Sequence, residues 1–446
     1  MLTAVATATR RLARLRLLVS GEASATERIL YFAAFVVLVC ARLPVVTLQG
    51  RLWAEEGWLF LWFGAWWPWY KALLVIWGGY LNIVANAAGV LSWHLVPVEQ
   101  IPRVTFAVAL VFQSCPAILL LTGRDSWLRP RAGLIAALLV LVLAPFAEEV
   151  WLNTIHAQFE LALCAALILA LELRGGAVGA FRLLLLALGP LSGPATVLVL
   201  PLFGLRALVE RSAGRIVQAC VLAAAAAIQL GVFYTPLSGR SFGFAPPLLL
   251  DTLFSHLVLP PLVPADMATD LGVWMRGHLD TPAMRVWLPL ATLGIAAAAA
   301  ALVVWMRRTA ALWLMAAAGV LGVISLLGSL FPGPDYVYPG FGARYTFVPQ
   351  VLLGWAFVVL AVEARPPWAL LAAVLVAWRI AVGAVDYFLP TPVFAHGPDW
   401  RQEVAEWRRD PGHRFHIWPA EDPWRLSLPP PGSPPDPDHL PYGPVW

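Results

Sequence analysis

The sequence is poor in charge. Only 13% of its 446 residues are charged and 60% are hydrophobic, whereas soluble domains carry about 25% charged residues. Lysine is almost absent, because Lys71 is the only one. Apolar runs recur along most of the chain, and a run of about 20 apolar residues crosses a bilayer. These features exclude an ordinary soluble domain and predict an all-α polytopic membrane protein.

Several well-defined functional motifs are also absent. The chain has no Walker-type phosphate loop, no GxSxG elbow, no HExxH helix and no CxxC pair. Nucleotide-driven transport and serine hydrolysis are therefore unsupported. The net charge of +4 comes from scattered arginines, so no nucleic-acid partner is expected. Four cysteines lie inside apolar runs and are expected to be buried thiols: Cys40, Cys115, Cys164 and Cys220.

The distribution of arginine predicts the orientation of the chain. Residues 1–28 are basic and are expected in the cytoplasm, because cytoplasmic loops carry an excess of Lys and Arg. A first span at roughly 29–48 then ends outside. Further spans are expected near 101–122, 132–147, 155–173, 215–235, 286–305, 309–330, 346–363 and 367–388, with a broken or re-entrant pair around residues 191–194. This scheme makes every inner loop basic and gives about eleven crossings, within a range of about nine to twelve.

The segment after the first span is not expected to cross. Residues 57–70 are dense in Trp and Phe, which is typical of the membrane interface. Residues 79–96 contain Asn82, Asn86 and His94, and a crossing there would place the basic loop at 124–131 outside. We therefore expect interfacial helices over about 57–96. They belong to a transmembrane domain at 29–389, followed by an outer Pro- and Trp-rich tail at 390–446 whose end should be largely irregular.

An acidic pair, Glu55 and Glu56, follows the first span directly. A carboxylate beside hydrocarbon is costly, so its presence indicates a function. Neighbouring residues point in different directions, and one of the two is expected to face a site. There it would act as a general base, with its affinity for protons raised by desolvation. The alternative is a solvated loop or a helix cap.

Polar groups also gather in the turn expected between the spans at 132–147 and 155–173. They are Glu148, Glu149, Asn153, His156 and, one turn further on, Glu160. His156 and Glu160 are four residues apart and would share a helical face. Imidazole and carboxylate groups at this spacing predict a possible divalent-cation site formed by Glu148, Glu149, His156 and Glu160. The alternative is a hydrogen-bonded polar pair inside the bundle.

Arginines near the later spans give two further hypotheses. Arg344, followed by Tyr345, is suited to binding a lipid phosphate, because a guanidinium can donate two parallel hydrogen bonds. The alternative is an anchor at the membrane interface. Arg379 and Asp386 lie seven residues apart in the last span, share a face and are expected to pair.

These features together resemble the GT-C superfamily of polyprenyl-phosphate-sugar-dependent glycosyltransferases. The resemblance covers roughly the first 390 residues. It is carried by the EEG sequence at 55–57, GYLN at 79–82, Asn153 to His156, LSGP at 191–194 and Arg344-Tyr345. In that superfamily the first-loop carboxylate is usually an aspartate, whereas this chain has two glutamates there.

The resemblance implies an inverting transfer of a sugar from a polyprenyl-phosphate donor to an envelope glycan or lipid acceptor. The reaction would occur at the periplasmic face of a bacterial plasma membrane, among membrane lipids. Glu55 or Glu56 would be the base, and Arg344 would lie near the phosphate. Further substrate-binding residues would be Tyr80, Asn82, Asn153, His156 and Tyr345. Some members of the superfamily need a divalent cation, and the resemblance leaves the cofactor of this chain unknown.

Two other functions remain open at this point. One is a flippase or transporter of lipid-linked substrates, and the other is a scaffold subunit in envelope polysaccharide assembly. A transporter should have discontinuous spans and polar groups near the midplane with access to both sides. An enzyme should gather its polar groups in one outward-facing cavity, formed here by Glu55 or Glu56, the 148–156 turn and Arg344.

Overall fold

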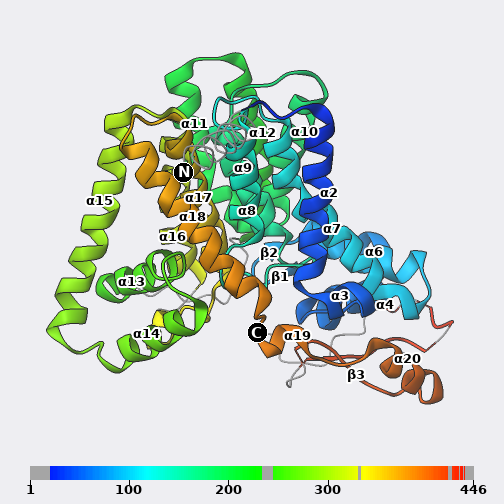
Figure 1. Ribbon diagram of the computed structural model, residues 1–446. Coiled ribbons are helices and arrows are strands. Elements are labelled where there is room, and N and C mark those ends of the chain that lie inside the picture. Colours follow the sequence, from blue (N-terminus) through cyan, green and yellow to red (C-terminus); the bar gives the residue numbers. More distant parts are fainter. Residues whose placement is uncertain are drawn as a thin grey trace, which may run out of the picture.

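The computed structural model describes residues 21–233, 245–329, 333–419, 424–430, 432–434 and 436. The described chain is mostly helical, with almost no strand (Figure 1). Its α-helices are α2 (Ala25–Arg42), α3 (Pro44–Gln49), α4 (Trp62–Trp66), α5 (Trp69–Ala72), α6 (Ile83–Leu95), α7 (Ile101–Thr122), α8 (Arg131–Val142), α9 (Ala157–Ala170), α10 (Gly176–Leu191), α11 (Leu200–Glu210), α12 (Ala213–Phe233), α13 (Pro246–Leu253), α14 (Ala265–Gly277), α15 (Leu288–Met306), α16 (Thr309–Ser329), α17 (Arg344–Glu363), α18 (Trp368–Phe388), α19 (Pro392–Ala395) and α20 (Trp400–Arg409).

Short elements connect these helices. Two antiparallel hairpins pair β1 (Ile76–Trp77) with β2 (Tyr80–Leu81) and β3 (Phe415–His416) with β4 (Arg425–Leu426). Single π-helical or 3₁₀-helical turns cover Glu56–Leu61, Val98–Gln100, Pro194–Val199, Phe254–Val258, Ala283–Trp287 and Pro334–Val337.

Six helices in the described part of the chain are long and apolar enough to cross a membrane. They are Val98–Thr122, Ala213–Val232, Ala283–Met306, Thr309–Leu327, Arg344–Glu363 and Trp368–Phe388. A seventh is counted if Gly176–Leu191 and Pro194–Glu210, bent by 117°, form one broken span. By helix length and composition, the chain is thus of the all-α, multi-pass membrane class.

The eleven expected crossings are not shown. The spans expected at 132–147 and 155–173 are helices of 12 and 14 residues. At about 1.5 Å per residue, each is shorter than the hydrocarbon core of a bilayer. The first expected span is divided into α2 and α3, because Leu43 leaves the helical conformation and Pro44 begins a new helix.

Helix α9 lies at the centre of the bundle. All 14 of its residues are buried, as expected for a helix that is apolar on every side. It packs against α7, α10, α16 and α17 (Figure 1). Because neighbours surround it, α9 holds the turn that precedes it at a fixed place at one end of the bundle.

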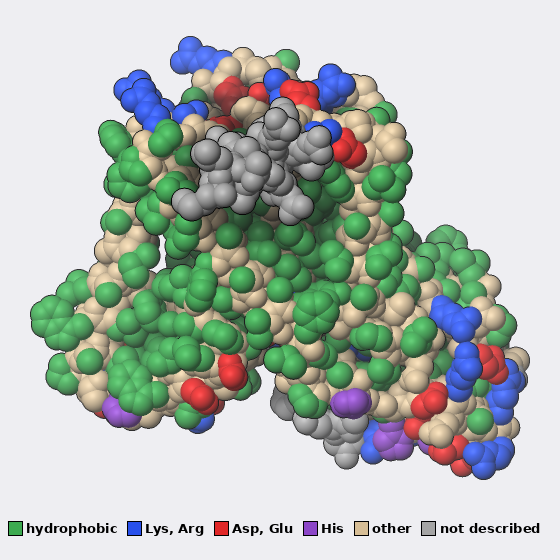
Figure 2. Space-filling model, in the orientation of Figure 1, with side chains coloured by type: hydrophobic (Ala, Val, Ile, Leu, Met, Phe, Trp, Pro, Cys, Tyr) green, Lys and Arg blue, Asp and Glu red, His purple; other side chains and the backbone are tan. Residues whose placement is uncertain are grey.

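The basic loops meet at the opposite end of α9. Three contacts join them: Arg131 with Glu27 at 2.7 Å, Arg308 with Glu363 at 3.9 Å, and Arg215 with the carbonyl of Leu171 at 2.8 Å. Figure 2 shows arginine side chains at this upper end of the molecule. The loops expected on the inner side therefore share one end, while the turn before α9 lies at the other.

The described part of the C-terminal segment packs onto the first loop. The Trp418 N–H donates to the Leu52 carbonyl at 3.0 Å, and the Ala54 N–H donates to the Trp418 carbonyl at 2.5 Å. The indoles of Trp62 and Trp66 donate to Ser427. Residues 400–419 and 424–428 share one aromatic core with the first loop, which forms a lobe at the lower right of Figure 1.

The expected pair between Arg379 and Asp386 is not formed. Asp386 accepts a hydrogen bond from the Phe146 N–H at 2.9 Å and faces Arg42 at 3.8 Å. Seven residues along a helix correspond to a separation of about 10 Å, and Arg42 on α2 comes closer. Arg379 instead lies beside Gly354 of α17.

Helix α6 lies very close to the aromatic segment at residues 57–70, and this approach involves two glycines, Gly64 and Gly89. A Cβ at Gly64 would lie 2.7 Å from the Gly89 carbonyl carbon, and a Cβ at Gly89 would meet the Phe60 carbonyl oxygen. We expect Gly89→Ala to lower the free energy of unfolding by about 1–3 kcal/mol, the usual cost of overpacking. The measurement is the thermal transition of the purified protein in detergent.

Gly204→Ala in α11 is the matched control, because nothing lies within 4 Å of its added Cβ. That variant should be unchanged or slightly stabilised, since alanine favours the helix. Equal transitions for the two variants would contradict the close packing of α6.

Candidate functional site

A cavity of about 520 Å³ lies at the end of α9 that is remote from the basic loops. The predicted site residues that line it are Glu55, Tyr80, Glu149, His156, Arg344 and Tyr345. A first-loop carboxylate, the turn before α9 and Arg344 therefore converge on one cavity, as expected. They come from segments almost 300 residues apart, which only the packing of the bundle brings together.

The two neighbouring glutamates have different surroundings. Glu56 is buried, and its Oε1 accepts from the Thr154 N–H at 2.8 Å and the Thr154 hydroxyl at 2.7 Å. Its Oε2 accepts from the Trp53 N–H at 3.1 Å. Glu55 is half-buried and lines the cavity. Glu56 therefore joins the first loop to the turn before α9, and Glu55 is the carboxylate that faces the site.

The backbone is strained in the first loop, at Ala54, and in the turn before α9, at Leu152. Ala54 has φ of 45° and Leu152 has φ of 59°, a left-handed region that residues with a Cβ rarely adopt. Hydrogen bonds hold both: Ala54 donates to Trp418, and the Leu152 N–H donates to Gln113 at 3.0 Å. Such strain persists only where the surrounding structure enforces it, and it is concentrated at functional sites.

Burial raises the pKa of Glu55 above its ordinary value, because a carboxylate loses its hydration there. The positive charge of Arg344 opposes this shift, and the negative charge of Glu149 reinforces it. Arg344 donates from Nη1 to Glu149 Oε1 at 2.6 Å and lies 4.9 Å from the centre of the Tyr345 ring. Its side chain is 35% exposed, and a guanidinium carries five N–H donors.

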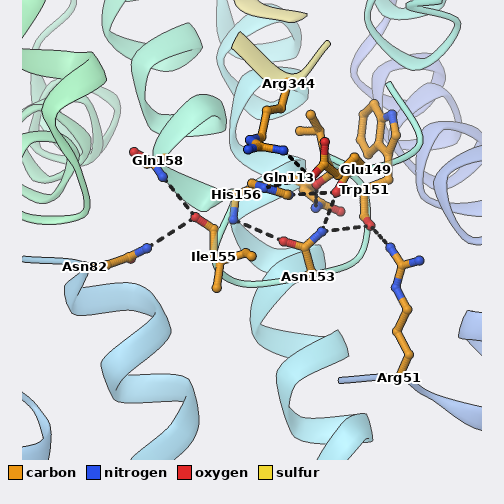
Figure 3. A network of polar contacts seen from close by, with 11 residues as sticks. Arg51, Asn82, Gln113, Glu149, Trp151, Asn153, Ile155, His156, Gln158 and Arg344 are labelled. Carbon is orange, nitrogen blue, oxygen red and sulfur yellow. Dashed lines mark hydrogen bonds and ion pairs between the residues drawn. The ribbon is translucent and has the colours of Figure 1, made fainter. Parts of the chain in front are cut away.

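His156 is held in a defined tautomer (Figure 3). Its Nδ1 lies 2.7 Å from the Glu149 carbonyl, which can only accept, so Nδ1 carries the proton. Burial lowers the pKa of His156 to about 4, and the ring is neutral at pH 7. Its Nε2 then has a free lone pair, 4.0 Å from the Glu149 carboxylate. The ring is suited to accepting a hydrogen bond in the cavity.

Two predicted substrate-binding residues support the wall of the cavity instead of lining it. Asn82 caps α6 by accepting from the Ala85 N–H, and it donates to the Ile155 carbonyl at 3.2 Å. Asn153 is fully buried and accepts from the His156 N–H at 3.1 Å (Figure 3). Both amides therefore fix the turn that carries His156.

The predicted metal ligands do not come together as a set. Glu148 accepts from the Thr391 N–H and hydroxyl, while Glu160 is buried in α9. The prediction from the four-residue spacing required His156 and Glu160 to lie in one helix, but His156 precedes the first residue of α9. The described part of the chain contains one group of three or more His, Cys, Asp or Glu whose ligand atoms lie within 4.8 Å of one another. That group lies in the C-terminal lobe and not in residues 148–160. Residues 148–160 therefore do not fit a divalent cation, and no step is assigned to one.

Sequence reasoning missed much of the cavity wall. Trp53, Trp77 and Trp424 line it, and Trp58 packs edge-on against both Trp77 and Trp424. Trp424 comes from the C-terminal segment, where the high tryptophan content was the only signal. Pro194, Ala195 and Leu198 from the bent pair also line the cavity.

No family model, curated protein or solved structure matches this chain. The function is therefore inferred from the chemistry of the cavity.

The unequal surroundings of the two glutamates predict unequal effects on stability. Glu56→Gln should lower the free energy of unfolding by about 1–3 kcal/mol, because an amide N–H₂ would then face a buried donor. Glu55→Gln, the matched control, should leave stability unchanged or slightly raise it, since it removes a desolvated charge. Thermal unfolding in detergent measures both. A loss of the same size in both variants would contradict the assignment.

Proposed function

We propose that this protein is a membrane glycosyltransferase of the GT-C type. It would move a sugar from a polyprenyl-phosphate donor to a cell-envelope glycan or lipid. The observation that carries this proposal is that Glu55 and Arg344 line the same cavity. A desolvated carboxylate supplies a base, and a guanidinium supplies a phosphate ligand. The tryptophans of the wall offer flat apolar faces for a sugar ring or a prenyl chain.

In the proposed reaction, the acceptor hydroxyl lies against Glu55. Its oxygen attacks the anomeric carbon on the face opposite the phosphate, and its proton passes to the Glu55 carboxylate. The bond between the anomeric carbon and the phosphate oxygen breaks, and the electron pair stays on the polyprenyl phosphate. Arg344 stabilises the charge that develops there. The configuration at the anomeric carbon is inverted.

Glu149 and His156 would orient the reacting groups. Glu149 accepts from one donor of Arg344 and fixes the direction of the guanidinium, which has further N–H groups for a phosphate. The neutral His156 ring would accept a hydrogen bond from a sugar hydroxyl through Nε2. Both residues belong to the turn that Glu56 holds against the first loop.

The two ends of the bundle support an orientation. The end that collects the basic loops would face the cytoplasm, and the cavity would open toward the outer, periplasmic side of a bacterial plasma membrane. The short helices of the first loop would then lie in the outer interface. The eleven-span scheme would also require α2 with α3, α8 and α9 to count as crossings, and each helix of the bent pair to count as one.

A lipid-linked transporter is the second candidate, and the bent pair favours it. Broken spans are typical of transporter binding sites, and the pair around residues 191–194 bends by 117° beside the cavity. A transporter would move the lipid-linked sugar across the bilayer without transferring it.

The decisive test uses purified protein in proteoliposomes with radiolabelled polyprenyl-phosphate sugars and a panel of envelope acceptors. We expect transfer by the wild type and a loss of at least about 100-fold in Glu55→Gln, the usual contribution of a general base. Because the base must be ionised, the rate should rise as the pH rises through the raised pKa of Glu55. Normal transfer by Glu55→Gln would rule out this base, and translocation without transfer would favour the transporter.

Arg344→Lys should lower kcat/KM for the donor by about 10- to 100-fold. The variant keeps the charge but loses the planar fork of donors, and a hydrogen bond to a charged group contributes about 1.5–3 kcal/mol. Arg276→Lys is the matched control, because Arg276 pairs with Asp335 on an exposed surface. Unchanged donor kinetics in Arg344→Lys would place the phosphate elsewhere.

A further inference from the structure

The C-terminal lobe contains a cluster of imidazole and carboxylate groups outside the cavity. Glu403 lies on α20, His413 in the turn that follows, and His416 on β3. His413 Nε2 is 2.8 Å from Glu403 Oε2, and His416 Nδ1 is 3.2 Å from Glu403 Oε1. The Oε2 atom of Glu406, one helical turn after Glu403, lies 3.6 Å from His413 Nε2.

The scaffold beneath this cluster is rigid. Trp400, Trp407 and Phe415 are buried, and the rings of Trp400 and Phe415 stack at 4.9 Å. The His416 N–H donates to Glu403 Oε2 at 2.7 Å, which fixes the start of β3 against α20. The three polar side chains are therefore presented from one side of an aromatic core, and none of them belongs to the cavity.

We propose that Glu403, His413 and His416 form a binding site for a divalent transition metal of the Zn²⁺ type. Around a tetrahedral ion with bonds of about 2.0–2.1 Å, ligand atoms lie about 3.3 Å apart. Glu403 Oε2 lies 2.8 Å from His413 Nε2 and 3.2 Å from His416 Nδ1, close to this value. The ligand atoms of all three residues lie within 4.8 Å of one another. Two imidazoles favour Zn²⁺ over Mg²⁺ and Ca²⁺, which prefer oxygen ligands.

Glu406 is the candidate fourth ligand. Its side chain is 50% exposed, and that of His416 is 43% exposed, so the ion has a path from solvent. On binding, each neutral imidazole keeps one proton, on the ring nitrogen that does not touch the metal.

The site gives the lobe a structural role. The ion would link α20 to β3, and β3 pairs with β4 next to Trp424 in the cavity wall. Bound metal should thus order the part of the cavity wall around Trp424, which is otherwise held by the packing of the aromatic core. The metal site does not depend on the proposed glycosyl transfer.

The test uses the full-length protein in detergent, with any affinity tag removed and metals stripped by a chelator. Titration with Zn²⁺ against a competing indicator dye should give one equivalent of binding. His413→Ala and His416→Ala should each weaken it by at least about 10- to 100-fold, since even the loss of an outer-shell partner has that effect. His396→Ala is the matched control, because His396 is exposed and outside the cluster.

Two further measurements separate the site from a folding defect. Co²⁺ substitution should give a visible absorption spectrum that changes in each ligand variant. Zn²⁺ should also slow hydrogen exchange over residues 400–418 in the wild type and in His396→Ala, but not in the ligand variants. Zn²⁺ binding that is unaffected by His413→Ala and His416→Ala, or no stoichiometric binding, would overturn the proposal and leave the cluster as hydrogen-bonded ion pairs.

Discussion

The geometry of the site depends on the buried carboxylate of Glu56. It accepts three hydrogen bonds, two from Thr154 and one from the Trp53 N–H, and so joins the first loop to the turn before α9. A buried charge is tolerated only when its hydrogen-bonding capacity is satisfied. Because α9 is surrounded by other helices, this contact fixes the first loop relative to the bundle core. Glu55, the residue immediately before Glu56, is thereby held at the cavity.

The cavity is closed by parts of the chain that are distant in sequence. Arg344 begins α17, Trp424 comes from the C-terminal lobe, and Pro194 comes from the bent pair. Each part is held by its own packing, and the cavity exists only where they meet. The aromatic core that the first loop shares with residues 400–419 and 424–428 brings the C-terminal lobe to the site. A single lobe thus supports both the cavity wall and the cluster around Glu403.

Sequence patterns predicted the all-helical membrane class and the grouping of the basic loops, because hydrophobic run length and arginine position are local properties. They also indicated Glu55, Arg344 and His156 as candidates. They were less informative on the number of crossings, because apolar composition does not distinguish a short buried helix such as α9 from a span. The Arg379–Asp386 pair was wrong for a related reason, since Arg42 on another helix lies nearer to Asp386.

The sequence by itself determined that the chain is of the multi-pass membrane class. It also showed that polar and charged groups, which are costly to place beside hydrocarbon, lie at the ends of its apolar runs. Only the tertiary structure decided which of Glu55 and Glu56 lines the cavity, because Thr154, almost 100 residues away, occupies the carboxylate of Glu56. It also decided that Asn82 and Asn153 support the wall and that the C-terminal segment completes the cavity. Hydrogen-bond partners and burial arise from long-range packing, and no local pattern encodes them.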